Sequence, residues 1–301
     1  MKTKLPNFLI VGAAKSGTSS LHNYLNQHID IFMPSYTEQG VKVKEPRFLI
    51  KDLIQNRVHN GIWNWSDYKE LFNNVKDEKL IGESTVLYLY YYKEAIKNIK
   101  LRLGDDIKII IMLRNPVERA YSAYQHVSRG MKENNTFEKA LELEEERLDK
   151  DPFLTPMVMY KSMGMYFKMV KAYLESFDQV HIIYYEDFRD NTMDSVQKTF
   201  DFLGVDRDPS INIKMYNVGG RRWKNHLLKR FFMKQGRFHF LLKLLIPNIF
   251  RTFFRNQLVN YSMENSPTIS LKVKKELRSF FKKDIEHLSK LLNKDLKHWI
   301  E

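Results

Sequence analysis

Apolar runs and helical patterns alternate along most of the chain. Continuous apolar runs that end in loop signals predict buried strands at Phe8–Gly12, Lys79–Ser84, Lys108–Pro116 and Val180–Asp187. A helical pattern follows each run, at Thr18–Gln27, Val86–Leu103, Val117–Arg129 and Asp194–Leu203. This order indicates a mostly parallel sheet that helices cover on both faces. The predicted fold class is therefore α/β, with three α/β/α layers.

Three further segments differ from this pattern. Residues 134–151 form one acidic helical pattern, which we expect to be exposed at the surface. Residues 209–263 contain no Asp or Glu but 11 Lys and Arg among many Phe and Leu, and Leu271–Leu292 has the spacing of a closing helix. Since repeats and low-complexity linkers are absent from the sequence, we expect one domain over residues 1–301, with a basic helical portion from about 209 to 301.

The composition is that of a folded protein with anionic partners. Hydrophobic residues make up 43% of the 301 positions and charged residues 28%, a balance that excludes a disordered chain. The sequence contains no cysteine, which excludes disulfides and thiolate metal ligands. The formal net charge of +13 indicates a partner such as nucleic acid, anionic lipid or an acidic small molecule.

Targeting signals are not apparent in the sequence. The strand-like run that begins at Phe8 leaves no room for a signal peptide before it. The most apolar segment, Phe238–Phe250, is interrupted by Lys243 and Pro247 and is shorter than the ~18–20 apolar residues that a spanning helix needs. We therefore expect a cytoplasmic protein, and we keep open a peripheral membrane contact through its basic C-terminal region.

The loop after the first predicted strand has the features of a phosphate site. Gly12 ends the strand, and Ser19 lies in the first turn of the following helix. The amides of that turn have no partner within the helix, and the helix dipole adds partial positive charge to them, so a phosphate fits there. Gly17 allows the backbone to approach an anion closely, and Thr18 and Ser20 add hydroxyl donors.

This loop is P-loop-like but lacks one part of the nucleoside-triphosphatase motif. The spacing Gly12-x-x-x-x-Gly17 matches that motif, yet Thr18 stands where the motif has its lysine. Because the lysine–Ser/Thr pair for terminal phosphates and Mg²⁺ is absent, we expect a metal-free phosphate rather than ATP·Mg²⁺. The alternative is a tight turn that binds nothing. Lys15 argues against it, because a lysine beside unpaired amides calls for an anion.

A second strand–turn–helix carries another candidate anion site. Arg114 lies where the predicted strand ends, and Pro116 suits the first turn of the next helix. Ser122 follows Arg114 by eight residues, about two helical turns. The carboxyl ends of parallel strands are where open α/β sheets bind ligands, and a guanidinium suits a phosphate. Taken alone, an arginine that caps the helix and pairs with Glu118 is the better interpretation. Two such sites together indicate a ligand with two separate phosphates.

These motifs resemble a known enzyme family. VGAAKSGTSSLHNYLNQH, KEPRFL, GESTVLYLY and MLRNPVERAYSAYQH, in this order, resemble the sulfotransferases that use 3′-phosphoadenosine 5′-phosphosulfate (PAPS), and most of all their glycan-modifying branch and its bacterial relatives. The resemblance covers about Asn7–Asp187. It implies that the loop residues hold the 5′ side of PAPS, and that Arg114 and Ser122 hold its 3′-phosphate. The loop residues in question are Lys15, Ser16, Gly17, Thr18 and Ser19.

The resemblance also implies catalytic roles. Lys15 is expected to donate to the bridging oxygen as the leaving phosphate gains charge, and Glu45 in KEPRFL is expected to act as the general base. A surface salt bridge with Lys44 or Arg47 is the alternative for Glu45. Glu83 either lies near the acceptor or orders the wall of the site.

The basic C-terminal region adds a weaker implication. A glycine-containing basic loop closes over the nucleotide in relatives, and RRWKNHL resembles it loosely, so Arg221 and Arg222 are candidate contacts to the 3′-phosphate. Residues 221–256 mix cations with Phe and Leu, which fits a lid for an anionic glycan, an interfacial helix or a packed helical subdomain.

The function expected from these motifs is transfer of a sulfuryl group from PAPS to a hydroxyl, with 3′-phosphoadenosine 5′-phosphate (PAP) as product and without a metal. The acceptor is expected to be a carbohydrate, a glycolipid or another small molecule, and not a nucleic acid. One alternative is a nucleotide kinase-like P-loop enzyme, which would need a magnesium site. The other is a basic protein that binds membranes or nucleic acid, which explains the net charge but not the two strand-end motifs.

Overall fold

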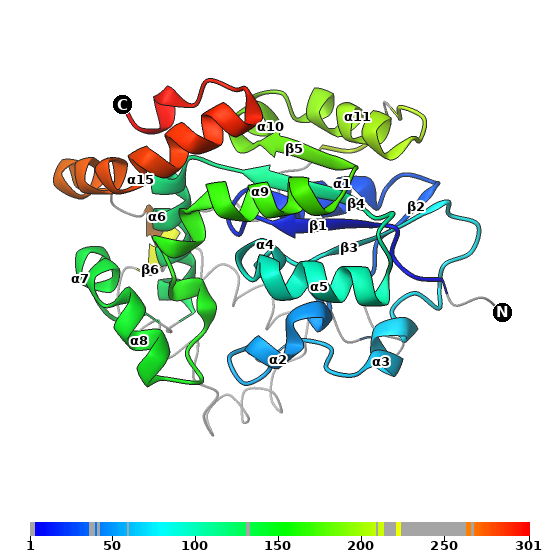
Figure 1. The fold of residues 1–301 in the computed structure, drawn as a ribbon, viewed down its shortest axis with the longest axis horizontal. Coiled ribbons are helices and arrows are strands. Elements are labelled where there is room, and N and C mark those ends of the chain that lie inside the picture. Colours follow the sequence, from blue (N-terminus) through cyan, green and yellow to red (C-terminus); the bar gives the residue numbers. More distant parts are fainter. Residues whose placement is uncertain are drawn as a thin grey trace, which may run out of the picture.

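The central feature of the fold is one parallel sheet. The computed structural model describes residues 4–35, 40, 43–58, 60–130, 133–208, 210–213 and 268–301, and the backbone of 221–223 and 263–265. Five strands pair in the order β2–β3–β1–β4–β5, and every pairing is parallel (Figure 1). Their bounds are β1 Phe8–Gly12, β2 Ile31–Phe32, β3 Leu80–Ser84, β4 Lys108–Leu113 and β5 Val180–Tyr184.

Helices lie on both sides of this sheet (Figure 1). Their bounds are α1 Thr18–Leu25, α2 Lys51–Ile54, α3 Trp65–Glu70, α4 Leu87–Tyr90, α5 Tyr92–Arg102, α6 Pro116–Arg129, α7 Phe137–Glu142, α8 Glu144–Lys150, α9 Tyr166–Ser176, α10 Tyr185–Asp190, α11 Thr192–Leu203 and α15 Leu271–Leu292. Short 3₁₀ turns lie at Phe48–Ile50, Pro156–Val158, Ser162–Gly164 and Lys297–Trp299.

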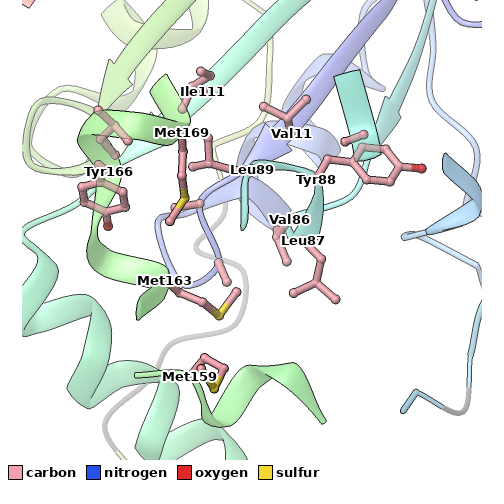
Figure 2. Packing of buried hydrophobic residues seen from close by; sticks show 14 of the residues in the cluster. Val11, Val86, Leu87, Tyr88, Leu89, Ile111, Met159, Met163, Tyr166 and Met169 are labelled. Atoms are coloured by element: carbon pink, nitrogen blue, oxygen red, sulfur yellow. The ribbon is translucent and has the colours of Figure 1, made fainter. Parts of the chain in front are cut away.

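The period of two along each strand divides the core between the two faces. Phe8 and Ile10 of β1 pack in a cluster with residues of α1 and α11, such as Leu21 and Phe200. The intervening residues of β1 pack with α4, α5, α6, α9 and α15. Figure 2 shows this second cluster from close by, with buried side chains of β1, β4, α4 and α9 labelled. The three-layer α/β/α prediction is therefore confirmed.

One predicted helix is in fact two. The pattern over Val86–Leu103 predicts a continuous helix, but Tyr91 leaves helical geometry, with φ −90° and ψ 39°, and separates α4 from α5. The rings of Tyr90 and Tyr91 meet edge to face there, 4.9 Å apart between centroids. Bulky aromatic side chains lose rotamer freedom in a helix, so this tyrosine-rich stretch favours a break.

The predicted acidic helix over 134–151 exposes most of its acidic residues, as expected, but it differs from the prediction in two respects. It forms α7 and α8 with a break at Leu143. The Glu144 carboxylate is buried and accepts hydrogen bonds from the backbone N–H groups of Lys161 and Ser162, at 2.7 and 2.8 Å. A partly buried turn needs an acceptor for its N–H groups, and this glutamate supplies it.

The C-terminal region contains strands as well as helix. β6 (Arg221–Trp223) and β7 (Met263–Asn265) form an antiparallel pair, and α15 has the bounds that the pattern predicts. Beyond α15 the chain returns to the core, where Trp299 is buried against the rings of Tyr166 and Tyr184. Most of residues 209–263 lie outside the described residues. Within the described part, every helix is too short or too polar to cross a membrane.

Candidate functional site

The loop between β1 and α1 has a compact backbone with unusual torsion angles. Gly12 approaches α4 so closely that a Cβ there would lie 2.6 Å from the Cβ of Leu89. Gly17 has φ 91° and precedes the first residue of α1, and within the described residues no side chain caps that helix end. The Ser20 N–H donates back to the Gly17 carbonyl at 2.9 Å, so within the described residues the N–H groups of Thr18 and Ser19 are the ones available to an anion.

Two residues of this loop have features that the binding of a polar ligand would explain. Lys15 adopts a left-handed backbone conformation, φ 72°, which is uncommon for a residue with a side chain. Ser16 is fully buried, and its hydroxyl has no hydrogen-bond partner in the described part of the chain. A buried hydroxyl without a partner is unfavourable in an isolated protein and is satisfied when a polar ligand enters.

Arg114 joins the second predicted site to the first. It follows β4, which pairs directly with β1, so both strands end at the same edge of the sheet. Its Nη1 donates a hydrogen bond to the carbonyl oxygen of Lys15 at 3.1 Å. Its guanidinium also lies over the ring of Tyr185, 4.4 Å from the centroid. The Tyr185 ring in turn lies close to Gly17, since a Cβ at Gly17 would be 3.3 Å from it.

The alternative role of Arg114, capping of α6, is taken by its neighbour. Asn115 is the N-cap, and its side chain accepts from the backbone N–H groups of Val117 and Glu118. Pro116 is the first residue of α6, as its position in the sequence predicts. Arg114 does pair with Glu118 at 3.5 Å, but the Glu118 side chain is half exposed, so this pair contributes at most about 1 kcal/mol.

One face of α6 extends the site. Ser122 is half-buried on this helix, and the helical period places His126 and Arg129 along the same face. The charge of Arg129 lowers the pKa of Lys15, and the charge of Lys15 lowers the pKa of His126. The sequence motif identifies Ser122 but not His126 or Arg129 as a site residue. Their positions, four and seven residues after Ser122, are the signal that identifies them.

The cations around Lys15 change its acid–base behaviour. Burial, together with the nearby charges of Arg129 and Arg114, lowers the pKa of Lys15 from its ordinary value of 10.5 to about 8. Burial and the cations Lys15 and Arg129 likewise lower the pKa of His126 to about 4. Several positive or potentially positive groups therefore share one small region, an arrangement that a multiply charged anion would stabilise.

Glu45 lies next to the loop and between two cations. Its carboxylate pairs with Arg47 Nη2 at 3.1 Å and with Lys44 Nζ at 3.6 Å. Lys44 also donates to the hydroxyl of Ser19 at 2.8 Å, which ties this segment to the first turn of α1. The ion pairs with both cations that the alternative interpretation names are thus present, and the carboxylate remains 18% exposed at the edge of the site.

Glu83 is near Glu45 but has a different environment. Its carboxylate is fully buried and accepts hydrogen bonds from the hydroxyls of Tyr68, Thr85 and Tyr88. Burial raises the pKa of Glu83 to about 7, although the three hydrogen bonds act in the opposite direction. A carboxylate enclosed in this way does not face an open acceptor position.

The remaining predicted contacts are described only in part. The backbone of Arg221 and Arg222 forms β6, which lies beside α6, the helix that carries Ser122. Their side chains lie outside the described residues, as does most of the basic segment 221–256. Among the residues that the structure describes, no three His, Asp or Glu side chains lie close enough together to hold a metal ion.

Comparison with known proteins identifies similar chains. Residues 5–218 match the family model described as a sulfotransferase domain. The crystal structure of a sulfotransferase from Alicyclobacillus acidocaldarius superposes with a TM-score of 0.73 at 29% sequence identity, and the match covers 99% of this chain and 100% of that chain. The similarity to this structure therefore extends over the whole fold.

Curated relatives match over shorter segments. Membrane-associated sulfotransferase kil1 of Dictyostelium discoideum is 31% identical over 132 residues, 44% of this chain and 25% of the relative. The human bifunctional heparan sulfate N-deacetylase/N-sulfotransferase 2 is 32% identical over 127 residues, 41% of this chain and 13% of the relative. Human carbohydrate sulfotransferase 15 is 25% identical over 249 residues, 67% of this chain and 44% of the relative. The chain thus spans a quarter or less of the length of the first two relatives.

Proposed function

The chain belongs to the sulfotransferase domain family, and on that premise we propose that it transfers the sulfuryl group of PAPS to a hydroxyl of a carbohydrate or glycolipid. We propose further that residues 1–301 form one domain. The observation that carries the proposal is the hydrogen bond from Arg114 to the Lys15 carbonyl, because it joins two anion-binding elements at one sheet edge. A ligand with two separate phosphates suits such a pair, whereas a single phosphate needs only one of them.

The residues present fit PAPS in charge and in hydrogen-bonding capacity. In the proposal the residues 15–19 and the first turn of α1 hold the 5′ side, and Arg114 and Ser122 hold the 3′-phosphate. The partnerless Ser16 hydroxyl and the uncapped N-terminus of α1 support the first assignment. The cation cluster around Lys15 supports the binding of a multiply charged anion. Arg221 and Arg222 are proposed as further contacts to the 3′-phosphate.

The proposed chemistry uses two side chains of the loop region. Glu45 takes the proton of the acceptor hydroxyl, and the hydroxyl oxygen forms a bond to sulfur. The bond between sulfur and the 5′-phosphate oxygen breaks, and its electron pair remains on that oxygen, which gives PAP. The Lys15 ammonium donates to this oxygen as its charge develops. Positioning and charge stabilisation supply most of the catalysis, as in phosphoryl transfer.

The proposed class of acceptor is based on the names of the relatives. One of them is named a carbohydrate sulfotransferase and another a heparan sulfate N-sulfotransferase, which supports a glycan acceptor. The second name also favours a second candidate function, sulfation of a glycan amine in place of a hydroxyl.

We propose a cytoplasmic location. A peripheral membrane contact through residues 221–256 would appear as co-sedimentation with anionic vesicles that salt reverses.

Two experiments test the proposal. In a thermal-shift assay, PAP should raise the unfolding midpoint, whereas ATP·Mg²⁺ and short DNA should not, because only a ligand of the folded state stabilises it. In a transfer assay, ³⁵S-labelled PAPS is incubated with N-acetylated and de-N-acetylated polysaccharides. Label on both substrates supports hydroxyl transfer, and label on the amine form alone supports N-sulfation. A shift with ATP·Mg²⁺ and none with PAP would favour the kinase alternative.

A further inference from the structure

The buried carboxylate of Glu83 lies near the end of β3. Its Oε1 accepts from the hydroxyl of Thr85 at 2.7 Å, and its Oε2 accepts from Tyr68 at 2.7 Å and from Tyr88 at 3.3 Å. No lysine or arginine forms an ion pair with this carboxylate among the described residues. Its only direct partners there are hydroxyl groups.

Two of these hydroxyls also accept hydrogen bonds from backbone. A hydroxyl has one proton and two lone pairs, so a hydroxyl that donates to a carboxylate can accept from an N–H. The Arg47 N–H donates to Thr85 Oγ1 at 3.2 Å, and the Leu49 N–H donates to Tyr88 Oη at 3.3 Å. In the described part of the chain the Tyr68 hydroxyl accepts from no backbone N–H.

Both N–H groups belong to the segment that carries Glu45. Arg47 has φ 60°, a left-handed conformation that needs support from its surroundings in a residue with a side chain. The side chain of Arg47 donates from Nη1 to the carbonyl of Asn60 and pairs from Nη2 with Glu45. The position of the Arg47 backbone therefore determines where this guanidinium holds the Glu45 carboxylate.

We propose that Glu83 is a positioning residue that fixes residues 45–49 through the hydroxyls of Thr85 and Tyr88, and thereby orients Glu45 toward the Lys15 loop. The proposal rests on the proposed function for the role of Glu45, but the arrangement of the segment does not depend on it. An ionised Glu83 accepts from both hydroxyls and leaves each of them free to accept an N–H. Contact between Glu83 and the acceptor does not fit the full burial of its side chain.

The test compares hydroxyl deletions that differ only in their link to the backbone. Thr85→Val and Tyr88→Phe each remove a hydroxyl that joins Glu83 to an N–H of the segment. Tyr68→Phe is the matched control, because it removes a hydrogen bond to the same carboxylate but no such link. Thr85→Ser keeps the hydroxyl and should restore wild-type behaviour. Glu83→Gln tests the carboxylate itself.

The first readout is amide hydrogen exchange of the full chain, which needs no activity. We expect peptides that contain Arg47 and Leu49 to exchange about tenfold faster in Thr85→Val and Tyr88→Phe, since each loses the acceptor of a protected N–H. Tyr68→Phe and Thr85→Ser should match the wild type. Equal acceleration in Tyr68→Phe, or none in Thr85→Val, would overturn the proposal whatever the enzyme catalyses.

The second readout separates turnover from binding. Thr85→Val should lower kcat about tenfold or more while the Kd for PAP stays within about twofold, because the hydroxyl link concerns Glu45 and not the phosphate loop. Tyr68→Phe should keep kcat within about threefold. A wild type without sulfotransferase activity would refute the proposed function and leave the exchange result intact. If Glu83→Gln does not fold, Thr85→Val and the Thr85→Ser control still test the positioning role.

Discussion

The guanidinium of Arg114 donates a hydrogen bond to the backbone carbonyl of Lys15 across 3.1 Å, although 99 positions separate the two residues in sequence. The contact exists because β1 and β4 are adjacent parallel strands that end at the same edge of the sheet. It also brings a fixed positive charge close to the Lys15 ammonium and contributes to its lowered pKa of about 8. Arg114 is therefore one of the groups, with burial and Arg129, that set how the proposed phosphate site should respond to pH.

Affinity for PAP should decrease as the pH rises through 8. In the free protein Lys15 loses its proton with a pKa of about 8, and a bound anion favours the protonated form. Binding then requires proton uptake above pH 8, and we expect about a tenfold loss of affinity between pH 7 and pH 9. Isothermal titration calorimetry measures it. Lys15→Arg keeps its charge and should flatten the profile, so equal slopes in both proteins would contradict the assignment.

Removal of the Arg129 charge should shift the midpoint of this pH dependence to higher pH. Arg129 is the largest charge effect on Lys15, and it lowers the pKa of that ammonium. Arg129→Gln should therefore raise the pKa of Lys15, and the pH at which PAP affinity falls should rise with it. Arg207→Gln is a suitable control, because that guanidinium is exposed and paired with Asp201. An unchanged midpoint in Arg129→Gln would place Arg129 outside the site.

Loss of the Arg114 side chain should selectively weaken the binding of nucleotides that carry a 3′-phosphate. Charge-assisted hydrogen bonds contribute about 1.5–3 kcal/mol, so Arg114→Ala should weaken PAP binding by roughly 10- to 150-fold. Binding of adenosine 5′-phosphate, which lacks the 3′-phosphate, should fall much less. Glu118→Gln removes the ion-pair partner of Arg114 and should leave PAP affinity within about twofold. Equal losses for both nucleotides in Arg114→Ala would mean that the arginine only supports the loop.

Glu45→Gln should separate catalysis from nucleotide binding. General bases typically contribute about 10²- to 10⁴-fold to a rate, so kcat should fall by that range. The Kd for PAP should change little, because the ion pairs of Glu45 involve Lys44 and Arg47 and not the backbone of the phosphate loop. Asp52→Asn, an exposed acid in the same region of sequence, is the control. Near-normal turnover in Glu45→Gln would refute its role as base.

The sequence was informative where neighbours in the chain decide the structure. Buried parallel strands are continuous Ile, Val and Leu runs, so Phe8–Gly12 was predicted with its observed bounds. Pro116 and Leu271–Leu292 likewise follow local rules for helix starts and helical periods. The strand order was not predicted, because pairing depends on contacts between distant segments. The adjacency of β1 and β4 is what brings Lys15 and Arg114 together.

Residues that act through distant partners cannot be identified from the local sequence, for the same reason. Glu144 looked like one of several exposed acids, but the backbone of Lys161 and Ser162 needs its carboxylate. The motif around Glu83 marks it as a candidate, yet the sequence alone does not distinguish its two possible roles. Its buried environment depends on Tyr68, which α3 supplies from a separate segment. Periodicity shows which face of a helix is apolar, but it does not identify the partner of a buried polar group.

The groups around Glu83 make its ionisation informative about stability. The phenols of Tyr68 and Tyr88 donate to its carboxylate, and Tyr173 and Glu45 lie within electrostatic range of it. Burial is the largest effect, and it raises the pKa of Glu83 to about 7 from its ordinary value of 4.5. The folded protein therefore holds a proton on Glu83 at pH values where the unfolded chain has released it.

Folding stability should consequently fall, relative to Glu83→Gln, as the pH rises from about 5 to 8. A carboxyl with a raised pKa in the folded state stabilises most below its unfolded pKa, and the contribution is lost as the pH passes through the folded value. A shift from 4.5 to about 7 corresponds to about 3 kcal/mol. Urea unfolding at four pH values measures the difference between wild type and Glu83→Gln, and a difference independent of pH would contradict the assignment. Over the same range kcat of the wild type should rise, because an ionised carboxylate accepts more strongly from Thr85 and Tyr88 than a neutral carboxyl does, so this site gains activity as it loses stability.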